Sequence, residues 1–193
     1  MYLLNFERKD NVLNFVLMVN YFELYGLPVS FHPDQSLVKK KFYELSRQFH
    51  PDRFAQAGAE AMDEALKMSA MVNDGYKILK SEDATINYIL KINAVIEDEE
   101  KYSLPAEFLM EMMDLNEALS EYEMEPTEHN RQLAVGNWQK QHEEISREID
   151  TVTGRFDNGN ESRELLLQIK DCYFRKKYLL RIQERMKSAQ PEE

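Results

Sequence analysis

Apolar residues recur at helical spacing along most of this chain of 193 residues. They return every three or four positions, which places them on one face of an α-helix. No segment shows the alternation of apolar and polar residues that a half-buried strand requires. The chain has only six glycines and six prolines to interrupt its helices. The pattern therefore predicts an all-α protein.

The first half of the chain predicts a helical hairpin. The apolar stripe of its first helix comprises Val38, Phe42, Leu45 and Phe49, and that of its second comprises Ala65, Met68, Val72, Tyr76 and Leu79. Asp34 is a suitable N-cap for the first helix, and a proline after His50 ends it. A loop of about ten residues then runs to about Gly58. Gly75, beside the second stripe, allows a neighbouring helix to approach closely. Short helices at about 20–25 and 84–91 are expected to cover the apolar face of the hairpin.

The second half predicts a bundle of three helices. An acidic run at residues 97–100 precedes it, and Ser103 with Pro105 is expected to begin its first helix. The second helix is expected at about 127–153 and the third at about 162–187, separated by a turn at Gly154 and residues 157–160. The stripes are Phe108, Met112, Leu115, Leu119 and Tyr122; then Trp138, His142, Ile145, Ile149 and Val152; then Leu165, Ile169, Cys172, Leu179 and Met186.

Charge and cysteine content limit the possible functions. The formal net charge is −11, and most of the excess acid lies after residue 96, while residues 20–96 are nearly neutral. Such a chain repels phosphate backbones, so protein partners are expected rather than nucleic acid. The single cysteine, Cys172, excludes an intramolecular disulfide and cysteine-rich metal ligation by this chain alone. A reducing cytoplasmic location is expected, with no cofactor and no metal site.

The first 18 residues are interpreted as an N-terminal extension. Their apolar run, within residues 12–22, is interrupted by Asn14 and Asn20 and is too short to cross a bilayer. We therefore expect no membrane partner. A signal peptide is disfavoured by Asp10 and by the lack of a small-residue cleavage site. Translation from Met18 is an alternative, in which residues 1–17 have no structural role.

The same three residue types occur twice, as His32-Pro33-Asp34 and as His50-Pro51-Asp52. The first copy is explained by its place at a helix start, with a proline entering the helix and an aspartate capping it. The second copy lies in the loop between the two predicted hairpin helices and follows a basic helix. Proline fixes the entry to this loop, and a histidine and a carboxylate can bond to a partner's polar groups. We therefore predict a docking element at residues 50–52.

This hairpin with its loop tripeptide resembles the J-domain of co-chaperones. The segments at residues 20–28 and 49–54 are more closely similar to the HscB family, over about residues 19–187. The resemblance implies a J-domain at 19–93, an acidic linker at 94–104, a client-binding three-helix bundle at 105–187 and a tail at 188–193. It implies a co-chaperone that accelerates ATP hydrolysis by a DnaK- or HscA-type chaperone and delivers an iron–sulfur cluster scaffold protein to it.

The resemblance also assigns the chaperone-binding residues. They are His50, Pro51, Asp52, Lys39, Lys40, Lys41 and Arg47. The lysines and Arg47 lie opposite or beside the apolar stripe, as either an ordinary solvated surface or a basic face that steers docking. Tyr43, Glu44 and Gln48 interrupt that basic face.

Several residues of the second half lie away from the predicted bundle core. On the first helix Leu109, Met110 and Met113 are neighbours of Asp114, Glu117 and Glu121, and on the third helix Leu167, Phe174 and Tyr178 form a second line. An apolar cluster with a charged rim indicates a protein-binding surface, unless it packs against the J-domain. The HscB resemblance assigns scaffold binding to Leu109, Met110, Met113, Asp114, Glu117, Glu121 and Phe174.

Two other functions are compatible with parts of this sequence. His50 and Asp52 could share proton transfer as a catalytic base and its orienting carboxylate, but no nucleophile motif, phosphate-binding loop or metal constellation accompanies them. No catalytic residue is therefore predicted. The nearer alternative is a J-domain co-chaperone, or a helical adaptor, that serves a different client protein.

Overall fold

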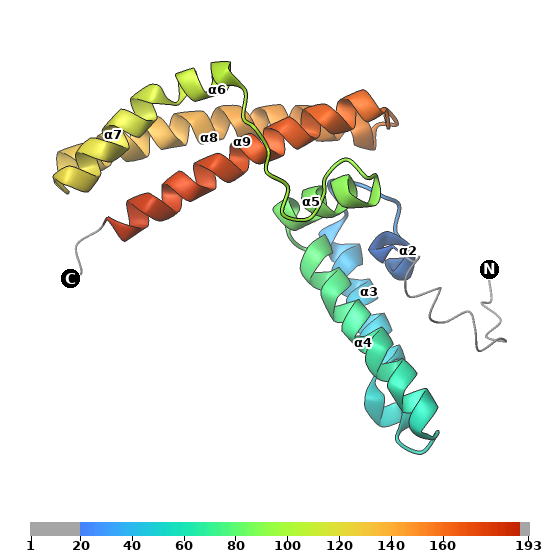
Figure 1. Ribbon diagram of the computed structural model, residues 1–193. Coiled ribbons are helices and arrows are strands. Elements are labelled where there is room, and N and C mark those ends of the chain that lie inside the picture. Colours follow the sequence, from blue (N-terminus) through green and yellow to red (C-terminus); the bar gives the residue numbers. More distant parts are fainter. Residues whose placement is uncertain (1–19, 190–193) are drawn as a thin grey trace. The chain divides into compact units, whose positions relative to one another are not determined.

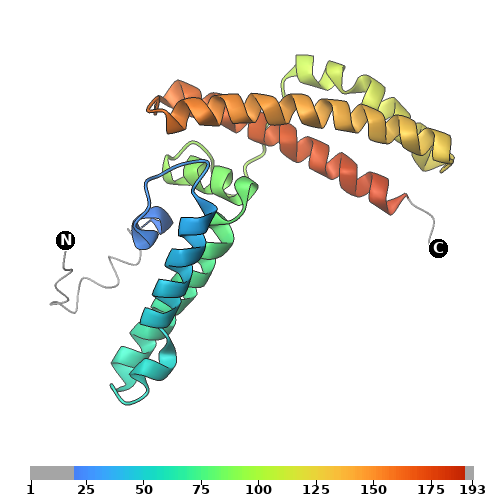
Figure 2. The same cartoon turned by 180° about the vertical axis from the view of Figure 1, so that it is seen from behind.

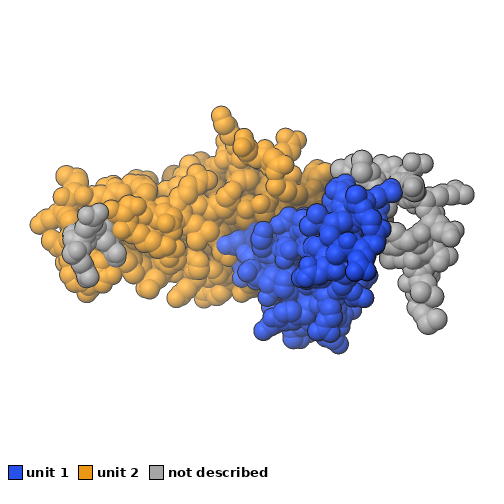
Figure 3. Space-filling view, turned by 90° about the horizontal axis from the view of Figure 1, so that it is seen from below, with its two compact units in different colours: residues 1–85 blue, residues 86–193 orange. Residues whose placement is uncertain are grey.

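The computed structural model describes residues 20–189 and contains helices but no strand in that range. The all-α prediction is confirmed. The chain divides into two compact units, residues 1–85 and 86–193, shown in different colours in Figure 3. The expected extension at residues 1–18 lies outside the described residues, as do residues 190–193 of the expected tail.

The first unit is built on an antiparallel helical hairpin. Its elements are α2 (Tyr21–Tyr25), α3 (Gln35–Gln48), the short 3-10 helix η1 (Pro51–Phe54), α4 (Ala59–Leu79) and the start of α5 (Glu82–Ile92). Helices α3 and α4 lie side by side, with η1 at the turn between them (Figure 1). The predicted hairpin is confirmed. Asp34 caps α3 as predicted, because its Oδ1 accepts hydrogen bonds from the amides of Ser36 (2.8 Å) and Leu37 (3.2 Å).

The core of this unit is concentrated at the α2 end of the hairpin. Val38 and Val72 are completely buried there. Phe42, by contrast, is only half-buried, although its ring stacks on that of Tyr76 at 4.2 Å. Figure 2 shows why: the η1 end of the hairpin extends beyond α2, so no third helix among residues 20–189 covers it. The predicted apolar stripe is therefore fully buried at the α2 end of the hairpin, whereas at the η1 end it is covered only by the contact between α3 and α4.

Gly75 permits the close approach of α2, as predicted. A β-carbon at this position would lie 2.8 Å from Cε2 of Tyr25 and 3.1 Å from Cδ1 of Tyr21. The Tyr25 hydroxyl donates a hydrogen bond of 2.6 Å to the Val72 carbonyl, one turn earlier on α4. Burial raises the pKa of Tyr25, which favours the neutral donor. The Tyr25 hydrogen bond therefore joins α2 to α4, and the lack of a side chain at Gly75 lets the two helices pack closely.

The second unit contains the bundle. Its elements after α5 are α6 (Ala106–Glu111), α7 (Met113–Met124), α8 (Glu128–Asp157) and α9 (Arg163–Ser188). The predicted stripes of the first and third bundle helices are entirely buried, whereas Trp138 and His142 of the second stripe are half-buried and stack on each other at 4.6 Å. Thr127 and Ser162 cap α8 and α9 through their side-chain oxygens.

The first bundle helix departs from its prediction at two points. It begins at Ala106 with Pro105 as its N-cap, so the expected cap at Ser103 is wrong. It is also divided at Met112, whose backbone (φ −83°, ψ 0°) leaves the helical region. The Met112 side chain is completely buried at this bend. The bend therefore lets both α6 and α7 direct apolar residues into one core.

The second bundle helix is longer than predicted. It continues through Gly154 to Asp157, so that the turn begins at Asn158 and contains Gly159 at φ +97°. Among residues 20–189, no helix is long and apolar enough to span a bilayer.

Candidate functional site

The loop tripeptide lies at the α3–α4 turn with its polar side chains directed outward. His50 has an extended backbone and caps η1, since its Nδ1 accepts a hydrogen bond of 3.3 Å from the Asp52 amide. The His50 and Asp52 side chains are 57% and 90% exposed, and their Nδ1 and Oδ2 atoms are 3.6 Å apart. Pro51 begins η1. The turn thus fixes the backbone while it leaves both polar groups accessible to a partner.

The predicted basic residues lie on α3, which leads into this turn. Lys39, Lys40 and Arg47 are exposed, whereas Lys41 is half-buried and its ammonium pairs with Glu44 at 3.1 Å. Arg53 donates a hydrogen bond of 3.2 Å to the carbonyl of Arg47 and so ties η1 to the end of α3.

A shallow hollow of about 410 Å³ opens beside the tripeptide, lined by Tyr43, Ser46, Arg47, His50 and Arg53. Its two guanidinium groups and one imidazole suit an acidic partner surface. Tyr43 and Arg53 were not predicted as site residues. The sequence contains no signal for Arg53, since only the turn brings it back to α3, whereas Tyr43 lies on α3 among the predicted basic residues.

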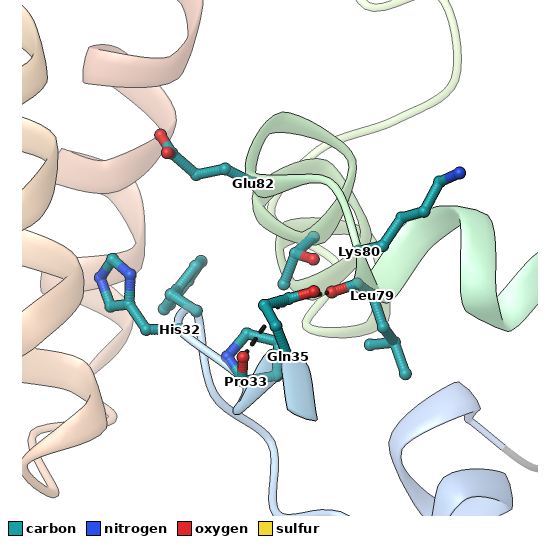
Figure 4. A pocket seen from close by; sticks show the side chains of 8 residues that line it. His32, Pro33, Gln35, Leu79, Lys80 and Glu82 are labelled. Carbon is teal, nitrogen blue, oxygen red and sulfur yellow. Dashed lines mark hydrogen bonds between the residues drawn. The ribbon is translucent and has the colours of Figure 1, made fainter. Parts of the chain in front are cut away.

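The other copy of the tripeptide has a structural role. Asp34 caps α3, and the Ser36 hydroxyl that donates to its carboxylate lowers the pKa of Asp34. Gln35 donates to the carbonyls of Pro33 (3.1 Å) and Leu79 (3.0 Å) and joins the start of α3 to the end of α4 (Figure 4). As predicted, the tripeptide at residues 32–34 therefore has a structural role at the start of α3.

The predicted client residues on α6 and α7 are exposed. Leu109, Met110 and Met113 are 43%, 62% and 65% exposed, on either side of the buried Met112. Their predicted rim, Asp114, Glu117 and Glu121, is also exposed, on α7. We call these six residues the α6–α7 patch. It displays two thioethers and a branched aliphatic side chain beside three carboxylates.

Phe174 does not belong to this exposed set, and the prediction of an off-core aromatic at this position is wrong. The side chain is only 7% exposed, and its ring stacks on that of Tyr102 at 4.5 Å with an angle of 8° between the planes. The neighbouring off-core residues differ from it. Leu167 is 47% exposed, and the half-buried Tyr178 exchanges hydrogen bonds with Asn116.

Phe174 is covered by a segment that the sequence predicted as an acidic linker. We call residues 95–102 the strap. The ammonium of Lys170 donates to the Val95 carbonyl at 2.9 Å and pairs with the Glu100 carboxylate at 2.5 Å. The Tyr102 hydroxyl donates to the Asp171 carboxylate at 2.7 Å. The strap is therefore fastened along one side of α9.

Electrostatics support these contacts. The hydrogen bond from Lys170 lowers the pKa of Glu100, and burial with the hydrogen bond to Asp171 raises the pKa of Tyr102 to about 12. Glu100 is thus held as a carboxylate and Tyr102 as a neutral donor at neutral pH. Tyr102 and Lys170 were missed by the sequence reasoning.

Within residues 20–189 no group of three or more histidine, cysteine or acidic side chains is placed to hold a metal ion. Cys172 is buried, and burial raises the pKa of its thiol to about 12.

Known proteins resemble this chain in both sequence and fold. The profile of the HSCB C-terminal oligomerisation domain family matches residues 104–187. The crystal structure of human co-chaperone protein HscB superposes with a TM-score of 0.70 at 27% identity, covering 89% of this chain and 82% of the human chain. The chain is therefore similar to HscB proteins in the sequence of its bundle and in the fold of both units. Chaperone HscB from Vibrio cholerae also matches with a TM-score of 0.70, at 28% identity, covering 88% of this chain and 96% of its own.

The HscB relatives known by sequence match a shorter part. A co-chaperone protein HscB homolog of Vibrio vulnificus is 40% identical over 104 residues. That match covers 53% of this chain and 61% of the relative, which is less than two thirds of its length. The HscB structures, by contrast, cover both compact units, which confirms the predicted architecture of a J-domain and a C-terminal bundle.

Proposed function

We propose that this chain is an HscB-type co-chaperone with one partner for each unit. Residues 50–52 and the basic residues of α3 engage an ATP-bound DnaK- or HscA-type chaperone and accelerate its ATP hydrolysis. The α6–α7 patch holds an iron–sulfur cluster scaffold protein, which the co-chaperone delivers. The chain itself provides no catalytic group, and the proposed place of action is the cytoplasm.

The observation that carries the chaperone assignment is the exposure of His50 and Asp52 on a backbone that is already ordered. Two polar side chains that are 57% and 90% exposed bury little of their surface, yet η1 holds them beside each other. Preorganised polar groups lose little entropy when a partner binds them. They favour whichever conformation of the chaperone offers complementary groups, and a ligand that binds one state better shifts the equilibrium toward it.

The basic face of α3 contributes to the approach of the chaperone. Lys39, Lys40 and Arg47 are exposed on the helix that leads into the tripeptide. Exposed charges mainly raise the association rate and are screened by salt. We therefore expect the stimulation to weaken at high ionic strength because the chaperone is captured more slowly.

The chaperone assignment is tested by single-turnover ATP hydrolysis of the chaperone with added co-chaperone. His50→Gln is expected to abolish stimulation, since glutamine cannot reproduce the imidazole that caps η1 and faces the partner. His32→Gln is the matched control and should stimulate as the wild type does. Stimulation that survives His50→Gln would remove the docking assignment.

The client assignment rests on the composition and exposure of the α6–α7 patch. Exposed methionines adapt to irregular partner surfaces, and a charged rim selects a partner of opposite charge. Leu109→Ser combined with Met113→Ser should abolish retention of the scaffold protein while helicity is unchanged.

The control for this double variant is Met124→Ser combined with Leu133→Ser. These residues are 88% and 44% exposed but lie outside the patch. The control should retain the scaffold. Equal binding by both double variants would show that the client binds elsewhere.

A further inference from the structure

We propose that Tyr102 is a partner-binding residue, and that it provides the aromatic contact that the HscB resemblance assigned to Phe174. This inference rests on the proposed function, because the partner it concerns is the scaffold protein bound at the α6–α7 patch. According to this proposal, the client-binding surface includes the strap, and the aromatic residue that contacts the partner is Tyr102 and not Phe174 of α9.

The burial of Phe174 is the first step. Tyr102 covers one face of its ring at 4.5 Å, and the ring of Tyr173 lies 5.6 Å away at an angle of 69°. The Lys177 ammonium is 5.5 Å from the centre of the same ring. A partner can reach Phe174 only after Tyr102 has moved away. Tyr102 itself remains partly exposed.

The second step is the attachment of the strap, which opposes that movement. Release of Tyr102 would break its hydrogen bond to Asp171 and the ring stack on Phe174. The Lys170–Glu100 pair next to it is also shielded, with side chains only 14% and 23% exposed. A contact surface with fixed backbone usually changes little on binding. The partner therefore meets Tyr102 in its place on the strap.

The third step is continuity with the α6–α7 patch. Asp171, which accepts the hydrogen bond from Tyr102, pairs with Arg175 at 2.8 Å. The Arg175 guanidinium lies 5.9 Å from the ring centre of Phe108, the residue before Leu109. Tyr102 and Leu109 are at most about 20 Å apart, given the four residues that lead into α6 and the helical rise. An interface of ordinary size, about 800 Å² per partner, extends that far.

The chemistry of tyrosine suits this role. A partly exposed ring offers apolar area with few rotatable bonds, and tyrosine is enriched among the residues that dominate binding energy. Here the Tyr102 hydroxyl is held by Asp171, and the Lys170 ammonium lies 5.7 Å from the ring centre. The ring is thus already oriented before the scaffold protein arrives.

The test measures the affinity of the full chain for the scaffold protein by isothermal titration. Tyr102→Ala should weaken binding about ten-fold or more, and Tyr102→Phe, which keeps the ring, should bind within about two-fold of the wild type. Leu66→Ala, at an exposed residue of the other unit, should leave the affinity for the scaffold protein unchanged. Wild-type affinity in Tyr102→Ala would overturn the proposal. A tighter complex would also overturn it, since Tyr102 would then be a lid over Phe174.

A direct contact readout separates this role from a structural one. A benzophenone amino acid at position 102 should cross-link to the scaffold protein, and the same group at the exposed position 66 should not. Absence of a cross-link at 102 would make Tyr102 a structural residue and overturn the proposal. Lys170→Met loosens the strap but keeps the ring, so it should weaken binding by only about two- to five-fold.

The two proposals fail differently. If the wild-type chain does not bind the scaffold protein, both are overturned. If the wild-type chain binds, and the Leu109 and Met113 double variant loses binding while Tyr102→Ala does not, the client site stands and only the role of Tyr102 is lost.

Discussion

The residues His-Pro-Asp occur twice in one unit, in two settings that use them in opposite ways. At 32–34 the aspartate is used internally, because its carboxylate caps α3. At 50–52 the aspartate side chain is 90% exposed and caps nothing, while the histidine caps the short helix η1. The difference shows that the role of the same residue depends on whether unpaired backbone amides lie within its reach. Matched pairs of identical residues can therefore test the account.

The largest difference is expected between Asp52→Ala and Asp34→Ala. Asp52→Ala should reduce chaperone ATPase stimulation to the background rate and change the free energy of unfolding by less than about 0.5 kcal/mol. Asp34→Ala should do the reverse: it should retain stimulation and lower the free energy of unfolding by about 1 kcal/mol, because α3 loses its N-cap. The measurements are single-turnover hydrolysis and calorimetric melting. Loss of stimulation in both variants, with both still folded, would mean that the two copies are not distinguished in this way.

A second pair compares two glycines within helices. Gly75→Ala should destabilise the first unit by about 1–3 kcal/mol, because the new methyl group would overlap the buried ring of Tyr25. The cost of this overlap exceeds the gain in helix propensity from glycine to alanine. Gly136 lies in α8, and a β-carbon there would meet no atom within 4 Å. Gly136→Ala should therefore stabilise α8 by about 0.5–1 kcal/mol. Denaturant melts followed by circular dichroism measure both. A stabilising Gly75→Ala would show that α2 does not pack as described.

A third pair compares two lysines that each pair with a glutamate. Lys170 and Glu100 are 14% and 23% exposed, whereas Lys41 and Glu44 are 39% and 49% exposed. Lys170→Met should cost about 1–2 kcal/mol, since it leaves Glu100 and the Val95 carbonyl without their donor. Lys41→Met should cost less than about 0.5 kcal/mol, because solvent screens an exposed pair. Chemical denaturation measures both, and equal costs would contradict the attachment of the strap.

The difference between wild type and Lys170→Met should also depend on pH. The pKa of Glu100 is lowered in the folded chain, so the pair stabilises the fold above the ordinary value of 4.5 and ceases to do so as the pH falls through the lowered pKa. The pKa of Tyr102 is raised to about 12, so its contribution is complete below 10.0 and is lost as the pH rises through about 12. Denaturation of both proteins from pH 7 to pH 3 should show the difference shrinking at the acid end.

Sequence reasoning predicted what depends on local periodicity. Val38, Val72, Leu115 and Ile169 are buried because each recurs on one face of its own helix. The hairpin and the N-cap at Asp34 were predictable for the same reason, since caps and prolines act on neighbouring residues. The bend at Met112 was not, because the spacing of the stripe continues through it and only the packing of α6 and α7 requires it.

Contacts between distant residues were beyond prediction. Phe174 has the spacing of an off-core residue on α9, yet it is buried by Tyr102, 72 positions earlier in the chain. Lys170 holds the Val95 carbonyl across 75 positions. Tyr102 and Val95 belong to no periodic pattern or motif, because the strap is not helical. When a helix face is buried against an irregular segment, neither the helix nor the segment shows a residue pattern that predicts the contact.

The most direct test of the unequal roles of the two tripeptides is amide chemical-shift perturbation of the labelled chain on titration with the ATP-bound chaperone. The account predicts the largest shifts at residues 50–54 and on the basic face of α3, with no change at residues 32–34. Shifts centred on residues 32–34, with residues 50–54 unaffected, would contradict it.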